Sequence, residues 1–434
     1  MTSSLGSRLA VSLAAAGAFA TPDTSFAGAF QINERSAKSQ GMSLADSVSG
    51  AKDATYAGFN PAALSTVGSF EAAGNLSFIA PISEGETERL VVQGQPAPLS
   101  TAGALGFTTE TNADRSAGVP ALSLGYRVTD AVVIGLNTRT EFGLATENPD
   151  NFIGAPDGIA SSLISVTASP TISYEVTDRL ALGAAFDVLY ADARLTSTAI
   201  ALDGDDFAYS FSVGGLWEPL DGTQLGVAYH NGYSLDVEGE GVFSPAAPAP
   251  LNLFAGQALD ATVRTELPNW VQAGVTQDIG GRARVSAEFR WFNWSRFDRL
   301  DTAIGALDFE NQDAQNYEDA FFVALGGEYD VTPAFTLRSG LAYDETPTQD
   351  TTALTEEGVG RTVRVPDGDR LWLSGGLSYD LGLFGQDMTL DAAYSYLLAL
   401  EDPTVTIRSG PFAGSEVEYR GGAHIFSIGT SLRF

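Results

Sequence analysis

The stretch LISVTASPTISYEVT (Leu163 to Thr177) alternates between two kinds of side chain. One face would carry Ile164, Val166, Ala168, Pro170, Ile172, Tyr174 and Val176, and the other Ser165, Thr167, Ser169, Thr171, Ser173 and Glu175. A period of two residues is typical of a β-strand, because successive side chains of a strand point to opposite sides. The stretch therefore predicts a strand with one apolar and one polar face.

The same alternation recurs along most of the chain. It is clear in FAYSFSVGGLW (Phe207 to Trp217) and in DMTLDAAYSYLLAL (Asp387 to Leu400). We find about fourteen such segments, each bounded by turn residues. They lie near 69–82, 119–129, 131–145, 160–176, 179–196, 207–218, 222–238, 262–279, 282–298, 317–330, 333–345, 367–381, 386–400 and 418–434.

The connections between these segments alternate between short and long. The short turns are VTDA from Val128, VTDR from Val176, EPLDGT from Glu218, DIGG from Asp278, DVTP from Asp330 and DLGLFGQ from Asp380. Longer acidic or Pro/Gly-rich loops are predicted near 83–118, 146–159, 197–206, 239–261, 299–316, 346–366 and 401–417. Short inner turns and long outer loops are features of membrane β-barrels, and closure of the sheet leaves no unpaired edge in lipid. The predicted fold is an all-β, transmembrane antiparallel barrel of about fourteen strands.

Aromatic residues and the last strand support the barrel. Residues beside the short turns would form an aromatic girdle at the inner membrane interface: Tyr126, Tyr174, Trp217, Tyr329 and Tyr379. The final segment HIFSIGTSLRF (His424 to Phe434) alternates and ends on an aromatic residue. That ending resembles the C-terminal signal of bacterial outer-membrane barrels. The resemblance implies that the barrel-assembly machinery binds the chain at Phe434.

Composition excludes several other classes of protein. The formal charge of −31 argues against nucleic-acid binding, which requires Lys and Arg to neutralise phosphates. The absence of Cys excludes a disulfide scaffold and any thiolate metal site. Lys occurs only at Lys38 and Lys52, so the chain has no polybasic patch for anionic lipid.

The first residues have the pattern of an export signal. Arg8 precedes an apolar run from Leu9 to Ala20, and SFA (Ser25 to Ala27) fits a small-x-small cleavage site. The run is about twelve residues long, whereas a helical membrane anchor needs roughly 20. We therefore expect residues 1–27 to be a cleaved signal peptide and the mature chain to begin at Gly28.

Residues 28–67 do not alternate, and they are too few to fold alone. A barrel of this size leaves a lumen that its own side chains do not fill. We predict that 28–67 is a hatch, or plug, inside the barrel formed by 68–434. Its NPA turn (Asn60, Pro61, Ala62) is rigid because Pro fixes its own φ angle, and we expect the flanking Phe59 and Leu64 to pack against the lumen wall.

Several motifs together resemble the FadL family, which includes the TodX-type channels, of outer-membrane transporters for long-chain fatty acids and aromatic hydrocarbons. They are GAFQINE (Gly28 to Glu34), NPA, EFGLATE (Glu141 to Glu147), LPNWVQAGV (Leu267 to Val275), WFNWSRFDRL (Trp291 to Leu300) and LRSGLAYDETP with PDGDRLWLSGGLSY (Leu337 to Tyr379). The resemblance covers 28–434. It implies passive uptake of apolar ligands, which bind near the outer loops and leave sideways through a gap at an inward kink of the third strand.

The resemblance also implies where the gap and the ligand groove lie. The kink would fall at Glu141, Phe142, Gly143 and Leu144, with Gly143 as the hinge because glycine tolerates unusual dihedrals. The transporters that the chain resembles usually have a long third outer loop, whereas here only TSTAIALDGDD separates Leu195 from Phe207. We therefore predict that the apolar fourth loop captures the ligand, through Leu251, Leu253 and Phe254.

The sequence offers no catalytic constellation. His230 and His424 are the two histidines; His230 lies on a polar strand face and is expected to form a hydrogen bond in the lumen. The DGDD stretch (Asp203 to Asp206) could bind Ca²⁺ or be a solvated acidic loop. Glu288 and Arg290 share one strand face and are predicted to form a lumen charge pair that holds the hatch, with a site for a ligand carboxylate as the alternative. We predict no enzyme activity, no cofactor and no metal.

The sequence predicts a monomeric transporter in the bacterial outer membrane, with both termini in the periplasm. It would carry hydrophobic small molecules, namely long-chain fatty acids or aromatic or aliphatic hydrocarbons, and contact outer-membrane lipid and lipopolysaccharide. Two alternatives stay open: a porin-like channel for polar solutes, and a surface adhesin that uses the acidic loops.

Overall fold

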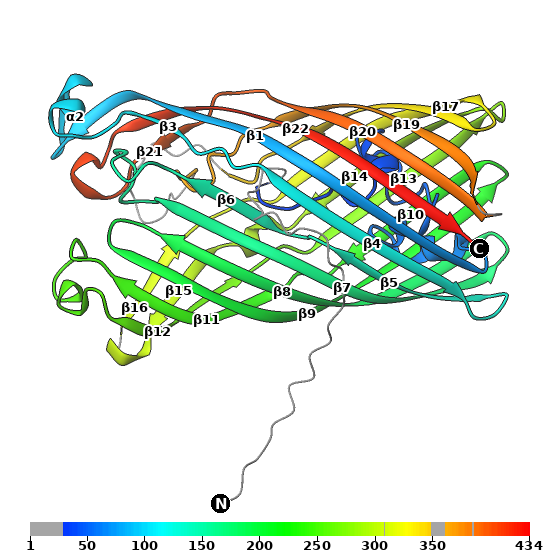
Figure 1. Ribbon diagram of the computed structural model, residues 1–434, viewed down its shortest axis with the longest axis horizontal. Helices are drawn as coiled ribbons and strands as arrows, with labels where there is room; N and C mark the ends of the chain where they lie inside the picture. Colours follow the sequence, from blue (N-terminus) through cyan, green and yellow to red (C-terminus); the bar gives the residue numbers. More distant parts are fainter. Residues whose placement is uncertain (1–28, 308, 349–360, 384–385) are drawn as a thin grey trace, which may run out of the picture.

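The computed structural model describes residues 29–307, 309–348, 361–383 and 386–434. The signal peptide expected at 1–27 lies outside the described residues. The wall of the molecule is one antiparallel sheet closed on itself (Figure 1). Its strands are β1 (Phe70–Val92), β4 (Ala117–Arg127), β5 (Val132–Arg139), β6 (Gly143–Glu147), β7 (Ala160–Thr177), β8 (Leu180–Thr196), β9 (Ile200–Leu220), β10 (Thr223–His230), β11 (Ser234–Phe243), β12 (Ala258–Glu266), β13 (Trp270–Ile279), β14 (Ala283–Phe292), β15 (Arg299–Ile304), β16 (Phe309–Ala314), β17 (Ala320–Thr332), β18 (Phe335–Asp344), β19 (Arg370–Leu383), β20 (Gln386–Ala399), β21 (Thr404–Thr406) and β22 (Glu416–Arg433).

Closure is made by the first and last strands. β1 pairs with β22 from Glu71↔Arg433 to Arg89↔Glu416. Several wall strands are split into two segments, as β5 and β6 are, or β10 and β11, and counting each as one gives a closed barrel of 14 strands. The all-β barrel predicted from the alternation is confirmed.

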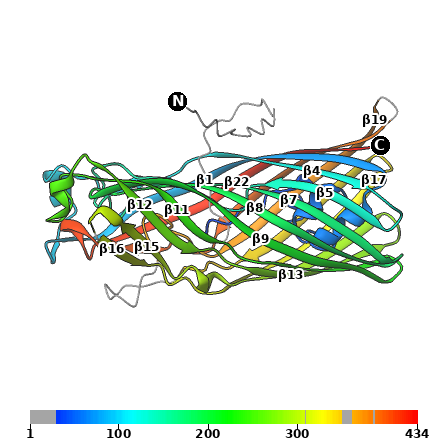
Figure 2. The ribbon, with the colours of Figure 1, turned by 90° about the horizontal axis from the view of Figure 1, so that it is seen from below.

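Residues 29–67 lie inside the barrel, in the half near the short turns and the C-terminus (Figure 2). We keep the name hatch for this segment. Its helical pieces are short: α1 (Ala37–Gln40), η1 (Ala54–Gly58) and η2 (Pro61–Thr66). Nearly every hatch residue is buried, and the buried residues include Lys38 and Phe59. This half of the lumen is thus occupied by a segment whose own elements are short helical turns.

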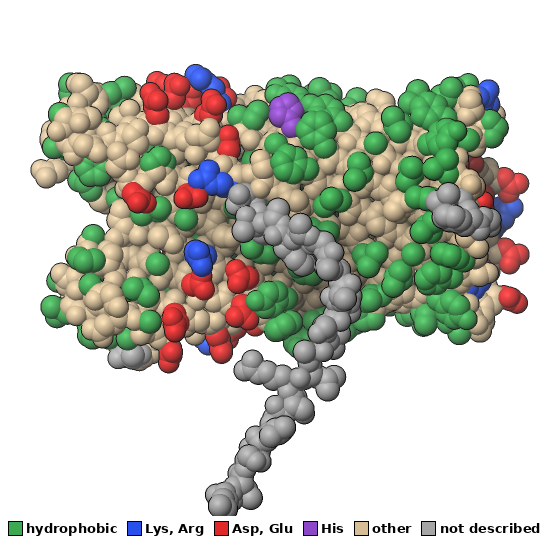
Figure 3. Space-filling model, in the orientation of Figure 1, with side chains coloured by type: hydrophobic (Ala, Val, Ile, Leu, Met, Phe, Trp, Pro, Cys, Tyr) green, Lys and Arg blue, Asp and Glu red, His purple; other side chains and the backbone are tan. Residues whose placement is uncertain are grey.

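The outer surface follows the predicted alternation. Large apolar side chains point outward from the wall, among them Leu76 and Phe78 on β1 and Ile428 on β22. The five girdle aromatics are all exposed beside the short turns. On the face shown in Figure 3, apolar side chains cover much of the half nearer the short turns, and charged ones gather in a band toward the long loops and at the edge of the short turns. Among the described residues, no helix is both long and apolar enough to cross a membrane.

Several segments predicted as outer loops are strands. β1 runs on to Val92, β8 and β9 meet at a turn of residues 197–199, and β15 and β16 pair with each other. Asp203 to Asp206 therefore lie in β9, not in an acidic loop. Beyond the membrane both faces of a strand can be polar, so the ladder continues where the apolar alternation stops. The remaining outer connections carry β2 (Gln95–Ala97), α2 (Ser100–Ala104), β3 (Glu110–Asn112), η3 (Leu251–Phe254), η4 (Trp294–Arg296), η5 (Gly305–Leu307) and η6 (Gly410–Phe412).

Candidate functional site

The third wall strand is broken between β5 and β6. Arg139 pairs with Thr167 of β7 and Gly143 pairs with Ile164, so residues 140–142 lie opposite only residues 165–166. The extra residue makes a bulge, which bends a strand and interrupts its ladder. On the other side, β4 pairs with β5 only as far as Leu122↔Thr138, and within the described residues no ladder joins β6 to β4. The wall loses its pairing at this point.

The first residues of the hatch pair with the broken strand from inside. The amide of Ile32 donates to the Glu141 carbonyl over 2.9 Å, and the amide of Gly143 donates to the Phe30 carbonyl over 2.9 Å. Gln31 and Phe142 face each other in an antiparallel bridge between these two bonds. The hatch thus satisfies backbone groups that the bulge removes from the wall ladder, as buried amides and carbonyls require.

The predicted kink residues lie at this break. Glu141 and Phe142 are buried, and Gly143 and Leu144 begin β6. Gly143 is not among the residues with positive φ, so the bend does not depend on a glycine-only conformation there. The hydroxyl of Ser165 on β7 accepts from the Phe142 amide at 2.9 Å and donates to the Phe142 carbonyl at 2.7 Å. These bonds hold the bulge in place, and the hinge role of Gly143 stays a prediction.

The carboxylate of Glu141 is held between two cations. It lies 2.8 Å from Arg35 of the hatch and 2.7 Å from Arg139 of its own strand, and all three side chains are buried. Arg139 also reaches Asp187 of β8 at 3.3 Å. A buried charge is tolerated only when it is paired, so the hatch and the broken strand are joined electrostatically as well as through the backbone.

A mainly apolar cavity lies beside the break. At one end it is lined by Phe30 of the hatch, Leu144 of β6 and Leu163 of β7. Leucine and valine side chains from β8, β9, β11 and β12 line most of the rest, together with Phe297 and Tyr317. The charged residues of the lining are Arg364, Asp203 and Glu240. Its largely apolar lining is that of a site for a small hydrophobic molecule.

The NPA turn lies against the wall, away from the cavity. The side chain of Asn60 accepts from the Ala62 amide at 3.0 Å, which caps η2, and donates to the carbonyls of Val48 at 2.8 Å and Gly215 at 3.0 Å. Pro61 occupies the first position of η2, where its missing amide hydrogen costs nothing. The turn is therefore a docking element that joins hatch and wall.

Wall glycines allow the hatch to approach this closely. A Cβ atom on Gly214 would lie 2.1 Å from Asn60 Oδ1, and one on Gly183 would lie 2.3 Å from the Ala62 nitrogen. Neither clash could be relieved by a flexible side chain, since the first is with a docked amide and the second with backbone. The inner wall is smooth at the places where the hatch touches it.

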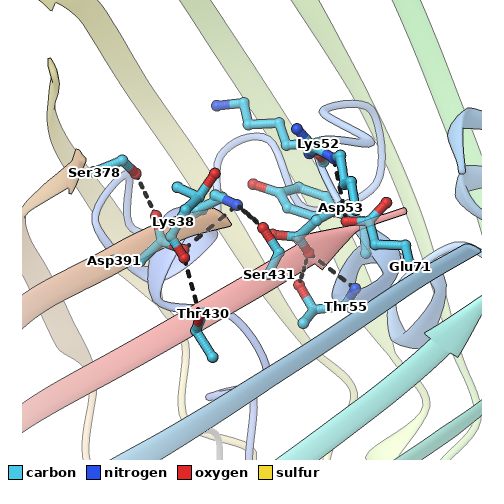
Figure 4. Close-up of polar contacts among 12 residues, drawn as sticks. Lys38, Lys52, Asp53, Thr55, Glu71, Ser378, Asp391, Thr430 and Ser431 are labelled. Atoms are coloured by element: carbon cyan, nitrogen blue, oxygen red, sulfur yellow. Dashed lines mark hydrogen bonds and ion pairs between the residues drawn. The ribbon is translucent and has the colours of Figure 1, made fainter. Parts of the chain in front are cut away.

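Further ion pairs join the hatch to the wall. Lys38 lies 2.5 Å from Asp53 within the hatch and 3.4 Å from Asp391 of β20 (Figure 4). Lys52 pairs with Asp46 of the hatch and with Glu328 of β17. Both lysines of the chain therefore join the two parts of the molecule.

The other predicted lumen residues also contact the hatch. Arg290 lies 2.6 Å from Glu288, and both bond to the Ser47 hydroxyl of the hatch. The ring of His230 lies with Nε2 2.7 Å from the Phe59 carbonyl. None of these three wall residues lines the cavity.

The predicted capture residues lie outside the cavity. Leu251 and Phe254 pack against an apolar cluster that includes Leu202 and Ile304, and Leu253 is 76% exposed at the tip of η3. Leu202 also lines the cavity, so the cluster separates the loop from the site. Within the described residues, no three His, Cys, Asp or Glu side chains gather closely enough to hold a metal ion.

Sequence reasoning missed Arg35, Arg139 and Arg364. Arg139 stands two residues before Glu141, so the period of two could have placed both on the inner face. Arg35 and Arg364 had no such signal, because irregular segments carry them.

A closed barrel with a plugged lumen and an apolar cavity beside a break in its wall is the architecture of an outer-membrane channel for hydrophobic molecules. The chain belongs to the outer membrane protein transport protein family (OMPP1/FadL/TodX), whose model matches residues 18–434. The protein is thus a β-barrel of the bacterial outer membrane, in a family of transport channels for fatty acids and aromatic hydrocarbons.

Individual relatives agree with this assignment. The chain is 24% identical to the 47 kDa outer membrane protein of Pasteurella multocida, over 94% of each chain. It is 23% identical to the long-chain fatty acid transport protein of Salmonella typhi, over 74% of this chain and 77% of that one. Its fold matches a Pseudomonas aeruginosa FadL homologue with a TM-score of 0.82 at 20% identity, over 94% of this chain and 100% of the other. The Pseudomonas putida toluene transporter TodX matches with a TM-score of 0.65 at 16% identity, over 93% and 99%.

Proposed function

We propose that this protein passively carries hydrophobic small molecules, long-chain fatty acids or aromatic or aliphatic hydrocarbons, inward across the outer membrane. The observation that carries the proposal is the position of the apolar cavity, which has Leu144 of the broken strand and Phe30 of the hatch in its lining. The cavity and the interrupted ladder are thus neighbours. The names of the relatives above supply the two ligand classes.

We propose a lateral exit at the break. An apolar molecule gains nothing by entering the aqueous periplasm, whereas its transfer into lipid is favourable by about 25 cal/mol per Å² of apolar surface. A path between β6 and β4, where no ladder is formed among the described residues, would let the ligand reach lipid without crossing water. Capture would begin at the exposed fourth loop, at Leu251, Leu253 and Phe254.

Substitution at the start of β6 tests the route. Gly143→Arg places a long charged side chain at the break, and we expect it to lower uptake of a labelled hydrophobic substrate strongly. Binding to the purified protein should persist, and the barrel should keep its heat-modifiable gel mobility. Leu163→Arg, in the lining but on the paired β7, is the comparison: it should impair binding itself. Wild-type uptake by Gly143→Arg would exclude the lateral route and favour an axial path past the hatch.

Two other functions make different predictions. A porin for polar solutes would conduct ions steadily in a planar bilayer, whereas the buried hatch argues for a closed lumen. An adhesin would need its outer loops but not its cavity. No observation in the described structure favours either.

We also propose how the barrel meets its surroundings. The apolar belt would contact outer-membrane lipid, and the charged band toward the long loops would face lipopolysaccharide. Phe434 is 55% exposed beside Phe70 at the end of the last strand, where the barrel-assembly machinery could bind it. The protein would act as a monomer with both termini in the periplasm.

A further inference from the structure

The wall has a second interruption, between β9 and the split strand formed by β10 and β11. β10 pairs with β9 as far as His230, and β11 resumes the ladder at Glu238. Residues 206–211 of β9 and residues 231–237 therefore face each other without a ladder, and all of them lie in the described part of the chain. We call these two stretches the seam. Six residues of a strand extend over about 20 Å, so the seam is long enough for a small molecule to pass.

A few bonds join the two edges of the seam near its ends. At one end the Ser210 hydroxyl donates to the Asn231 carbonyl at 3.0 Å and accepts from the Asn231 side chain at 3.1 Å, and the Asn231 amide donates to the Phe211 carbonyl at 3.0 Å. At the other end the amide of Asp236 donates to the carboxylate of Asp206 at 2.8 Å. Each such bond contributes little to stability by itself. The seam is therefore held less firmly than a wall joint with a continuous ladder.

The position of the seam along β9 places it opposite the outer leaflet of the membrane. It begins at the acidic stretch that ends with Asp206, and it finishes well before Trp217 of the inner girdle. Three aromatic side chains of β9 point outward along it and are exposed: Phe207, Tyr209 and Phe211. Each of these rings packs against an aromatic ring of a neighbouring strand. The outer edge of the seam is thus an aromatic surface on which apolar molecules dissolved in lipid can bind.

The apolar cavity lies directly behind the seam. Leu235 and Val237, which belong to the seam, line the cavity. Across from them, Ala208 of β9 points inward and is buried in the same apolar cluster as these two residues. The inner edge of the seam is therefore apolar and continuous with the cavity wall.

A residue of the seam also contacts the break at β5 and β6. The ring of Tyr233 packs edge-on against Phe142, with ring centroids 6.2 Å apart, and its hydroxyl donates to the Glu141 carboxylate at 3.4 Å. Any movement of residues 231–233 must therefore change the contacts of the first break.

One further interruption of the wall is occupied by protein. It lies between residues 265–269 and 293–300, where the chain forms η4 and buries Trp294 completely. Neither edge of the seam forms a helical turn in the described structure: β9 runs through it unbroken, and β11 begins after the three residues 231–233. The seam thus differs in having strand on both edges and nothing inserted by its own chain.

We propose that the seam opens to admit apolar molecules that are already dissolved in the outer leaflet, and that they pass from there directly into the cavity. The ligand then comes from lipid and not from water, so this entrance is distinct from capture at the long loops. Such a molecule exchanges one apolar environment for another and never meets water on its way. Tyr233 links the entrance to the first break. The inference rests on the proposed function, because it names the source from which the same cavity is filled.

Labelling from the lipid phase tests the opening. Protein in phospholipid vesicles is exposed to pyrene maleimide, a thiol reagent that dissolves in lipid. The chain has no cysteine, so Ala208→Cys places a single thiol on the inner edge of the seam. Ala191→Cys is the matched control, because Ala191 is also buried and inward but is paired with Ser165 on one side and Asp206 on the other. We expect Ala208→Cys to be labelled faster by about tenfold or more, since bonded strands flank the control position on both sides.

The control also identifies the route of the reagent. Ser165 holds the bulge of the first break through its bonds to Phe142, so Ala191 lies beside that break. A reagent that entered through the first break would label Ala191→Cys at least as fast as Ala208→Cys. That result would overturn the inference and leave the proposed function standing.

Loosening the seam should speed both labelling and uptake. Ser210→Ala removes the hydroxyl that joins the two edges, and we expect it to raise the labelling rate of Ala208→Cys about fivefold, the effect of one lost hydrogen bond. Uptake of labelled hexadecane supplied in lipid should rise with it; hexadecane carries no charge that Asp203 and Glu240 of the lining could repel. Ser212→Ala is the control, because Ser212 is buried on the same face of β9 where the ladder is intact, and it should change neither rate.

The outcomes separate the inference from the proposed function. Faster labelling without faster uptake in Ser210→Ala would overturn the entrance alone. The two cysteine variants decide whether the seam opens even if Ser210→Ala does not fold, which heat-modifiable gel mobility would reveal. If the wild type takes up neither hexadecane nor hexadecanoate, the proposed function itself fails.

Discussion

The guanidinium of Arg35 in the hatch lies 2.8 Å from the carboxylate of Glu141 in the break of the third wall strand. The plug and the wall gap are therefore parts of one buried contact. Since the main chains of the same two segments also pair, through Ile32 and Gly143, the hatch cannot leave its place without exposing the break. We expect changes on either side of this contact to affect the other.

Removal of the two partners should have unequal effects. Arg35→Ala leaves Glu141 paired with Arg139, whereas Glu141→Ala leaves Arg35 without its carboxylate and Arg139 with only Asp187. Breaking a buried pair typically costs about 3–5 kcal/mol, because an uncompensated charge stays behind. Glu141→Ala should therefore increase hydrogen exchange of the hatch more than Arg35→Ala does. An equal or larger effect of Arg35→Ala would contradict this assignment.

A disulfide should lock the hatch to the break. The chain has no cysteine, so Gln31→Cys combined with Phe142→Cys allows one pairing only. Facing residues of an antiparallel bridge lie about 4.5–5.5 Å apart, within the span of a disulfide. We expect uptake of a hydrophobic substrate to fall when the bond is formed and to recover on reduction. The reduced protein is its own control, and unchanged uptake in the oxidised state would mean that the hatch need not move.

Alanine substitutions at two adjacent glycines should have different effects. A Cβ atom on Gly214 would lie 2.1 Å from Asn60 Oδ1, whereas the nearest neighbour of one on Gly215 would lie 3.5 Å away. Gly214→Ala, like deletion of Asn60 to Ala62, should release the hatch turn and make the hatch sensitive to protease. Gly215→Ala should behave as the wild type, and both barrels should stay heat-modifiable. Equal protease resistance of the two variants would argue against docking through Asn60.

The exposed tip of the fourth loop should affect capture without affecting stability. Leu253 is 76% exposed, so Leu253→Ser removes almost no buried surface. We expect slower uptake at low substrate concentration, with unchanged thermal unfolding and unchanged affinity of the cavity. Leu99→Ser, an exposed leucine of another outer loop, is the comparison. If the two variants take up substrate equally, the fourth loop has no special role in capture.

Much of the wall could be predicted because one physical signal repeats. The strand expected at 160–176 is observed at Ala160–Thr177, since lipid on one side and lumen on the other impose the alternation directly. The signal ends where the membrane does. Asp203 to Asp206 are polar on both faces, so the missing alternation predicts a loop, yet their backbone pairs with β8 and β11.

The sequence by itself determined the closed barrel, the outward direction of its apolar side chains and the presence of a plug. These features depend on local periodicity and chain length. Only the tertiary structure decided which charges meet. Arg35 and Glu141 are 106 residues apart, and Arg364 reaches Ala160 across 204. No local pattern encodes such pairs. They form because closure of the sheet and insertion of the hatch bury these groups together, where each charge and each backbone amide must find a partner.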